Sequence, residues 1–247
     1  MTVVLVHGNP ETAAIWDPLR AELGRDDVIA LSPPGFGAPV PDGFGATSDD
    51  YLAWLVGEVE RLDGPIDLVG HDWGGGHVQR LAATRPDLIR SWCSDITGVA
   101  DPDYVWHDMA QVWQTPGAGE EMIEAMIGGS LTDRQAIFAG LGAPADIAAA
   151  MAEGATPEMG RCILTLYRDA AQPVAKELGQ RLLAAARPPA LVILASDDPY
   201  VSAALGAETA AALGAEVLRL DGCGHWWMFE EPGRAADGLV AFWSSLD

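Results

Sequence analysis

The segment with the clearest chemical pattern is residues 68–76, LVGHDWGGG, in which Asp72 lies between Gly70 and Gly74. An apolar run precedes it and an amphipathic stretch follows it, so it is predicted to be a turn from a strand into a helix. The G-x-D-x-G pattern indicates a nucleophile elbow with aspartate in place of serine, because a turn this sharp needs glycines on both sides. Such a turn lifts Asp72 to a helix N-terminus, whose dipole favours an anion. The alternative is a Gly-rich helix start in which Asp72 is only a capping residue.

Two more segments follow in the chain order that catalytic residues take when the nucleophile lies on such an elbow, which is nucleophile, acid and then histidine. Asp198 follows the apolar run 190–195, and His225 lies in a Gly-rich loop after the run 216–220. A carboxylate from the earlier strand end can hold the tautomer of His225, whose ring can lean over the elbow. Asp72, Asp198 and His225 are therefore the predicted catalytic residues.

The turn His7-Gly8-Asn9-Pro10 ends the first apolar run and completes the predicted site. It supplies one backbone N–H of an oxyanion hole, and the residue after the nucleophile, Trp73, supplies the other. By itself, the His7-Gly8 pair is equally typical of an ordinary turn at the end of a strand.

Short apolar runs that alternate with amphipathic stretches must position these residues. This alternation predicts an α/β fold with a mostly parallel sheet of about six strands and helices on both faces. The helices are expected at 16–23, 49–62, 74–83 and 203–213. The strands are expected at 2–6, 28–31, 66–69, 91–96, 190–195 and 216–220.

Residues 98–187 interrupt this alternation. The stretch contains no clean strand and is rich in Ala, Gly, Met, Trp and helix-like segments. It lies between two expected strands, which predicts a helical cap inserted into a core made of residues 1–97 and 188–247.

Composition excludes several classes of partner. The chain has 247 residues, 36 Asp and Glu against 14 Lys and Arg, and a formal net charge of −22. This charge repels nucleic acids and anionic membrane surfaces. The three dispersed cysteines favour a reducing cytoplasm, and the five histidines show no metal-ligand spacing. No signal peptide or membrane helix is expected at the N-terminus, and no metal or other cofactor is expected.

With these motifs in place, the chain resembles the α/β-hydrolases that use an aspartate nucleophile, a branch that holds haloalkane dehalogenases, epoxide hydrolases and haloacetate dehalogenases. The resemblance covers nearly the whole chain, except that the family usually has two strands before the HG motif. It implies an α/β-hydrolase fold without those N-terminal strands. It also implies an alternative acid, Asp95, because another dehalogenase group keeps its acid at that place.

The branch carries out two kinds of hydrolysis, and both begin with a carboxylate that attacks carbon to give an alkyl-enzyme ester. Asn9 and Trp73 stand where one large group of haloalkane dehalogenases holds the departing halide. Tyr167, within Leu166-Tyr167-Arg168, resembles a cap tyrosine that donates to an epoxide oxygen. The resemblance therefore favours dehalogenation narrowly over epoxide hydrolysis, with cap aromatics Trp106, Trp113 and Tyr167 in the pocket.

The expected partners are a small apolar organic substrate and water, with no nucleic acid and no membrane. The sequence leaves the natural substrate and the oligomeric state open. A competing hypothesis is a noncatalytic small-molecule-binding protein on the same fold, which would show little or no turnover.

Overall fold

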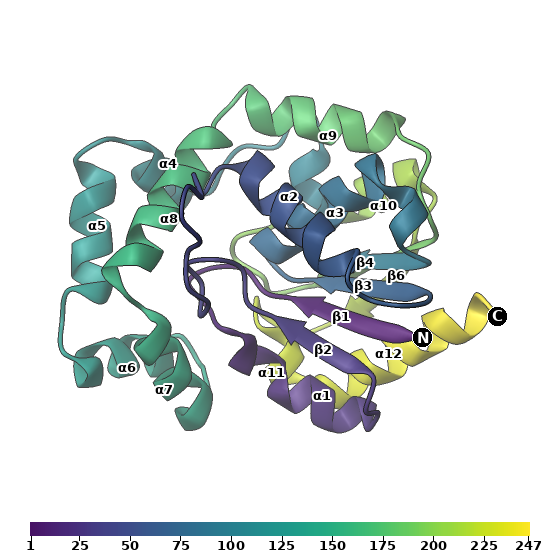
Figure 1. Ribbon diagram of the computed structural model, residues 1–247, viewed down its shortest axis with the longest axis horizontal. Coiled ribbons are helices and arrows are strands. Elements are labelled where there is room, and N and C mark those ends of the chain that lie inside the picture. Colours follow the sequence, from purple (N-terminus) through teal and green to yellow (C-terminus); the bar gives the residue numbers. More distant parts are fainter.

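The computed structural model describes all 247 residues, and its centre is one six-stranded sheet (Figure 1). All strand pairs are parallel, and the strand order is β2-β1-β3-β4-β5-β6. The strands are β1 Thr2–Val6, β2 Val28–Leu31, β3 Ile66–Gly70, β4 Ser91–Ser94, β5 Ala190–Ala195 and β6 Glu216–Leu220.

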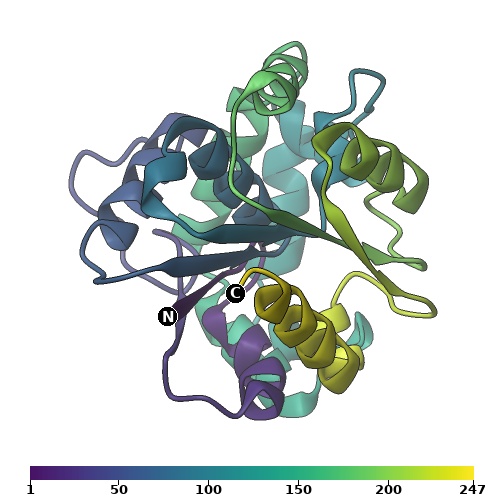
Figure 2. The same cartoon turned by 90° about the vertical axis from the view of Figure 1, so that its right-hand side faces the viewer.

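The central strands are apolar and buried because helices cover both faces of the sheet. Helices α2, α3 and α10 lie on one face, and α1, α11 and α12 lie on the other (Figures 1 and 2). The bounds on these faces are α1 Asp17–Leu23, α2 Ser48–Val59, α3 Trp73–Thr84, α10 Ala203–Leu213, α11 Trp227–Glu230 and α12 Pro232–Ser245, with 3-10 turns η1 Ala13–Trp16 and η2 Pro86–Leu88.

The register of the sheet brings three chain turns to one edge. Val6 at the end of β1 pairs with Gly70 of β3, and Gly70 pairs with Ser94 of β4. Because the strands are parallel, the residues that follow them meet at their carboxyl ends. The sheet thus positions the turn 7–10, the elbow at Asp72 and residue Asp95 side by side.

The chain between β4 and β5 forms only helices. They are η3 Thr97–Ala100, α4 Asp108–Gln114, α5 Ala118–Ile127, α6 Leu131–Gly140, α7 Ala145–Gly154, α8 Pro157–Asp169 and α9 Val174–Ala184. Helices α5, α6 and α7 lie at one side of the molecule, whereas α9 returns over α3 (Figure 1). One continuous buried cluster joins sheet residues such as Leu5 to helical residues such as Met159.

The expected elements agree with this fold, and their ends differ in places. The predicted α/β architecture with a mostly parallel sheet of about six strands is confirmed, and every strand pair of the sheet is parallel. The expected strand 91–96 ends at Ser94, because Ile96 has already left the extended conformation with φ −107° and ψ 25°. The expected helix 16–23 begins with the turn η1 and continues as α1. None of the helices combines the length and the apolar character that a membrane crossing requires.

Candidate active site

The turn between β3 and α3 holds Asp72 in a conformation that few residues adopt. Its φ is +49° and its ψ is −128°, which is strained for a side chain other than glycine. The flanking glycines are required by close contact. A Cβ on Gly70 would lie 2.5 Å from the Gly74 carbonyl oxygen, and one on Gly74 would lie 2.1 Å from that of Val6. The glycine pattern therefore exists because strand, turn and helix touch directly.

A backbone donor holds the Asp72 carboxylate. Its Oδ1 accepts a hydrogen bond from the backbone N–H of Asn9 at 3.1 Å, and the nearby backbone N–H of Trp73 acts to lower the pKa of the carboxyl group. Its Oδ2 lies 3.9 Å from Nε2 of His225. Burial raises the pKa of Asp72 to about 6, because the protein interior solvates an anion less well than water.

His225 and Asp198 form a hydrogen-bonded pair. The Nδ1–H of His225 donates to Oδ2 of Asp198 at 2.8 Å, which leaves Nε2 facing Asp72. The backbone N–H of Tyr200 donates to the other oxygen of Asp198 at 2.7 Å. Burial and the nearby His71 act to lower the pKa of His225, but Asp198 and Asp72 together hold it above its ordinary value.

Asp95, the alternative acid, contacts a different histidine. Its Oδ2 accepts hydrogen bonds from Nδ1 of His71 and from the indole N–H of Trp227, and its Oδ1 accepts one from the backbone N–H of Asp72. No hydrogen bond joins Asp95 to His225, whose Nδ1 is bonded to Asp198. The geometry therefore places Asp198, and not Asp95, on the candidate catalytic histidine.

A buried charged network lies beneath the site. The ring of His71 bridges Asp95 and Glu11, with 3.0 Å between its Nε2 and Glu11 Oε1. Burial acts to lower the pKa of His71, but the two carboxylates raise it well above its ordinary value, which favours the protonated ring. Glu11 also accepts from the indole N–H of Trp226 and from the backbone N–H of Gly8. The network thus ties together the turn after β1, the elbow and the histidine loop.

Three residues bring possible metal-ligating atoms within 4.8 Å of one another, namely Glu11, His71 and His225. The Oε1 atom of Glu11 already accepts two N–H donors, from His71 and Trp226. The Oε1 atom of Glu11 and Nε2 of His71 are thus already hydrogen-bonded to each other, and this pairing suits a proton-bearing network better than a cation.

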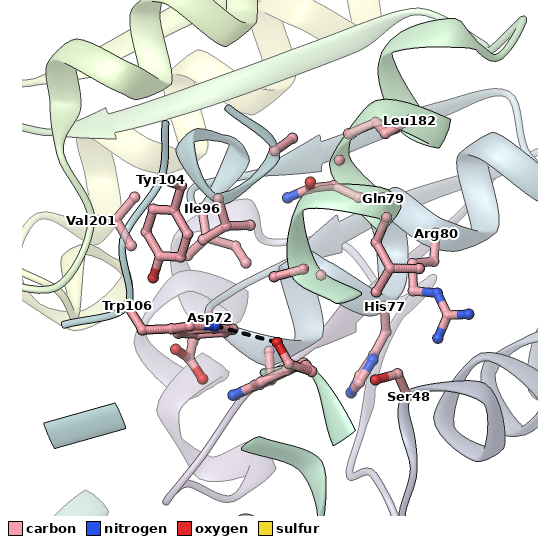
Figure 3. A pocket seen from close by; sticks show the side chains of 18 of the residues that line it. Ser48, Asp72, His77, Gln79, Arg80, Ile96, Tyr104, Trp106, Leu182 and Val201 are labelled. Carbon is pink, nitrogen blue, oxygen red and sulfur yellow. Dashed lines mark hydrogen bonds between the residues drawn. The ribbon is translucent and has the colours of Figure 1, made fainter. Parts of the chain in front are cut away.

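A cavity of about 120 Å³ opens from Asp72, and 14 of its 24 lining residues are hydrophobic. Asp72 and Trp106 lie at one end, and Leu182 and Arg80 lie at the other (Figure 3). The indole N–H of Trp106 donates to the carbonyl oxygen of Ala170 at 3.3 Å, which fixes the ring at the wall. The other aromatic residues of the wall near Asp72 are Trp73, Tyr104, His107, Tyr167 and Tyr200.

The charge of the Asp72 carboxylate affects the pKa of all three tyrosines of this wall. Burial raises the pKa of Tyr104, Tyr167 and Tyr200, and the Asp72 carboxylate raises each of them further. They therefore remain protonated and can donate hydrogen bonds into the cavity. Sequence reasoning missed Tyr200 and His107; the position of Tyr200, two residues after Asp198, was the available signal.

One expected pocket residue, Trp113, and one expected halide-binding residue, Asn9, have surroundings that differ from those predicted. Trp113 does not line the cavity; it is buried behind Tyr167, with ring centroids 4.7 Å apart. The side-chain amide of Asn9 is buried and has no hydrogen-bond partner, although its backbone N–H holds Asp72. Trp73 lines the cavity and stacks on Trp106 with centroids 5.7 Å apart.

Comparison with known proteins agrees with this fold. The chain is 26% identical to a haloalkane dehalogenase of Bradyrhizobium diazoefficiens, over 98% of this chain and 86% of that protein. It is 31% identical to an epoxide hydrolase of Caballeronia sordidicola, over 36% of this chain and 29% of that protein. Several curated relatives, including this epoxide hydrolase, are matched over only about a third of their length.

Among solved structures, a haloalkane dehalogenase of Bradyrhizobium elkani superposes with a TM-score of 0.76 at 24% identity, over 100% of this chain and 91% of that one. At 24% identity, this structural similarity supports the assignment of the fold alone. The sequence model described as the alpha/beta hydrolase family matches residues 3–237. The expected family is thereby confirmed: the chain belongs to the alpha/beta hydrolase family.

Proposed function

We propose that this hydrolase breaks a carbon–heteroatom bond through an alkyl-enzyme ester on Asp72. The observation that carries the proposal is the position of the Asp72 carboxylate between a backbone N–H donor and the ring of His225. The backbone N–H of Asn9 donates to Oδ1, and Nε2 of His225 lies 3.9 Å from Oδ2. An aspartate at an elbow attacks a saturated carbon, whereas the serine of an ordinary esterase attacks a carbonyl.

In the first step, Oδ2 attacks the substrate carbon and the leaving group departs with the electron pair of its bond to that carbon. The product is an ester whose carbonyl oxygen is Oδ1. In the second step, Nε2 of His225 removes a proton from water, and the hydroxide attacks the Asp72 carbonyl carbon. The backbone N–H groups of Asn9 and Trp73 stabilise the resulting oxyanion. The oxyanion collapses and the bond to the alkyl oxygen breaks, the proton on His225 passes to that oxygen to give the alcohol, and the re-formed Asp72 carboxyl group ionises.

Charge changes at Asp72 help His225 to act in the second step. In the free enzyme the Asp72 carboxylate is one of the groups that raise the pKa of His225. Ester formation removes that negative charge, so the pKa of His225 falls and the ring is available as a base. Asp198 holds the ring so that Nε2 faces the ester.

Hydrolytic dehalogenation of a haloalkane is the favoured reaction. The relative aligned over 98% of this chain is a haloalkane dehalogenase. The buried side-chain amide of Asn9 has no hydrogen-bond partner within the protein, so its N–H groups are free to act as donors. We propose that Asn9 and the indole N–H of Trp73 together hold the departing halide.

Epoxide hydrolysis is the second candidate, and the tyrosines favour it. An opening epoxide produces an alkoxide that requires O–H donors, and three protonated tyrosines line the cavity near Asp72. A shorter alignment also relates the chain to an epoxide hydrolase. Tyr167 on α8 is the donor proposed for this reaction.

The nucleophile is tested by trapping the ester. Asp72→Ala should lose turnover, and His225→Gln should form the ester without hydrolysing it. Mass spectrometry of His225→Gln after exposure to a bromoalkane should then show an alkyl group on the peptide that contains Asp72. An unmodified peptide, or near-normal turnover by Asp72→Ala, would contradict the mechanism.

The substrate class is tested by a pair of variants on one bromoalkane and one epoxide. Asn9→Ala should slow bromide release by roughly 10²-fold, the usual effect of removing one donor to a developing charge, and should hardly affect the epoxide. Tyr167→Phe should do the reverse. If Tyr167→Phe abolishes activity while Asn9→Ala is silent, epoxide hydrolysis replaces dehalogenation as the assignment.

A further inference from the structure

The wall of the cavity around Asp72 is made largely of tryptophan and tyrosine rings. These rings come from the start of α3, the loop before α4, helix α8 and the loop after β5, so they approach the carboxylate from four segments of the chain. The five residues are Trp73, Tyr104, Trp106, Tyr167 and Tyr200. The chain also has five phenylalanines, but none of them lines the cavity. The wall therefore consists of the electron-rich rings, and tryptophan is the one that attracts cations most strongly.

Trp106 lies at the centre of this wall and contacts three other rings. Its ring centroid is 5.7 Å from that of Trp73, 5.3 Å from that of Tyr104 and 5.4 Å from that of Tyr167. Figure 3 shows Trp106 and Tyr104 at the same end of the cavity as Asp72. A cation is attracted when it lies within about 6 Å of a ring centroid, so one that contacts Trp106 is also within reach of its neighbours.

The groups at this end of the cavity carry an excess of negative charge. Four carboxyl groups meet there, but only two histidines, His71 and His225, are positioned to balance them. The four are Glu11, Asp72, Asp95 and Asp198. The third histidine of the site, His107, adds no positive charge at pH 7, because burial and the nearby His225 lower its pKa.

The two arginines that line the cavity belong to its other end. Arg80 lies far from Asp72 in Figure 3, and Arg181 precedes Leu182, which lies at that end as well. The whole chain has a formal net charge of −22, which also attracts cations. Aromatic rings, local carboxylates and total charge thus all favour a positively charged ligand beside Asp72.

We propose that the rings around Asp72 form a cage for an organic cation, and that the substrate carries a quaternary ammonium group close to the carbon that Asp72 attacks. The proposal rests on the proposed function and specifies its substrate class as small haloalkanes or epoxides that bear such a group. The cavity of about 120 Å³ suits a compact group of this kind, since a cavity of about 150 Å³ holds benzene.

Binding is tested with a pair of ligands that differ only in charge. Choline and 3,3-dimethylbutan-1-ol have the same shape, because carbon replaces nitrogen in the second. Calorimetric titration at pH 8, where Asp72 is ionised, should show that choline binds at least about tenfold more tightly. Asp72→Asn should weaken choline binding and leave the neutral alcohol unaffected. These measurements do not depend on the ester mechanism.

Turnover is tested with the corresponding bromides, (2-bromoethyl)trimethylammonium and 1-bromo-3,3-dimethylbutane. With the first, the Asp72 carboxylate displaces bromide to give a choline ester, and hydrolysis of the ester releases choline and a proton. We expect its KM to be about tenfold lower than that of the neutral bromide. Glycidyltrimethylammonium and 1,2-epoxy-4,4-dimethylpentane provide the same comparison for epoxide opening.

Matched variants assign the binding to the cage. Trp106→Leu keeps an apolar side chain but removes the ring, so it should remove most of the preference for choline while the neutral alcohol still binds. Trp54, a partly buried tryptophan on α2 outside the lining, is the control, and Trp54→Leu should behave like the native protein. Should Trp106→Leu fail to fold, Tyr200→Leu carries the same comparison.

Choline that binds no more tightly than 3,3-dimethylbutan-1-ol, or an equal response of Trp106→Leu and Trp54→Leu, would overturn the cage. Equal KM values for the charged and neutral substrates would overturn the substrate class. Selective binding of choline without product from any bromoalkane or epoxide would leave the cage standing and refute the proposed function.

Discussion

Two features of Asp72 lower the stability of the folded protein. Its φ is positive, and burial of its carboxylate raises the pKa of the group to about 6. A carboxyl whose pKa is higher in the folded than in the unfolded protein favours folding when protonated. Its ionisation therefore lowers stability as pH rises from about 4 to above 6. This shift corresponds to at most about 3 kcal/mol.

We therefore expect Asp72→Asn to be more stable than the native protein at pH 8 and equally stable near pH 4. Asparagine has no charge to bury, and it tolerates positive φ. Thermal unfolding at the two pH values measures the difference, which should reach several degrees at pH 8. A difference independent of pH would mean that charge at Asp72 is not the cause.

The two candidate acids should give different kinds of defect. Asp198→Asn disturbs the tautomer of His225 and should lower turnover by several orders of magnitude while the fold survives. Asp95→Asn removes the charge that faces His71 and weakens its bond to Trp227, so it should lower the free energy of unfolding by about 3 kcal/mol or more. Kinetics and urea unfolding of both variants check the contrast. A stable, active Asp95→Asn would contradict the structural role given to Asp95.

At the scale of elements, the elbow depends on direct contact between β1 and the first turn of α3. Gly74→Ala would bring a methyl group to 2.1 Å from the Val6 carbonyl oxygen, so it should lower the free energy of unfolding by several kcal/mol. Gly57, inside α2, is the matched control because no atom lies within 4 Å of its added Cβ. Gly57→Ala should raise stability by up to about 1 kcal/mol, because alanine favours the helix. Urea midpoints of both variants measure the contrast, and a mild Gly74→Ala would show that the elbow can shift.

Elements whose pattern is local were predictable from the sequence. The strands follow from apolar runs, and the elbow follows from glycines that flank Asp72. The pairing of His225 with Asp198 agrees with chain order. The network of Glu11, His71 and Asp95 was not predictable, because its members come from three distant turns and leave no local pattern.

The orientation of helices was the other feature that the sequence could not determine. Trp113 and Tyr167 are both aromatic residues on helices, but only packing decides that Tyr167 faces the cavity while Trp113 lies behind it. Periodicity identifies a buried face; it does not say whether that face meets a cavity or the core.

For the whole molecule, the net charge of −22 implies strong self-repulsion in the compact state. Salt shortens the range of this repulsion, from about 30 Å at 0.01 M to about 10 Å at 0.1 M ionic strength. The melting temperature at pH 7 should therefore rise by a few degrees over this range.

Sodium acetate is the appropriate salt for this experiment, since a halide could also bind beside Asn9 and Trp73. The same titration near pH 4.3, the isoelectric point of the sequence, is the control and should show little change, because the net charge is then close to zero. A melting temperature that falls with salt at pH 7 would mean that the ion pairs of the surface, such as Arg85 with Glu60 and Asp87, contribute more to stability than the repulsion removes.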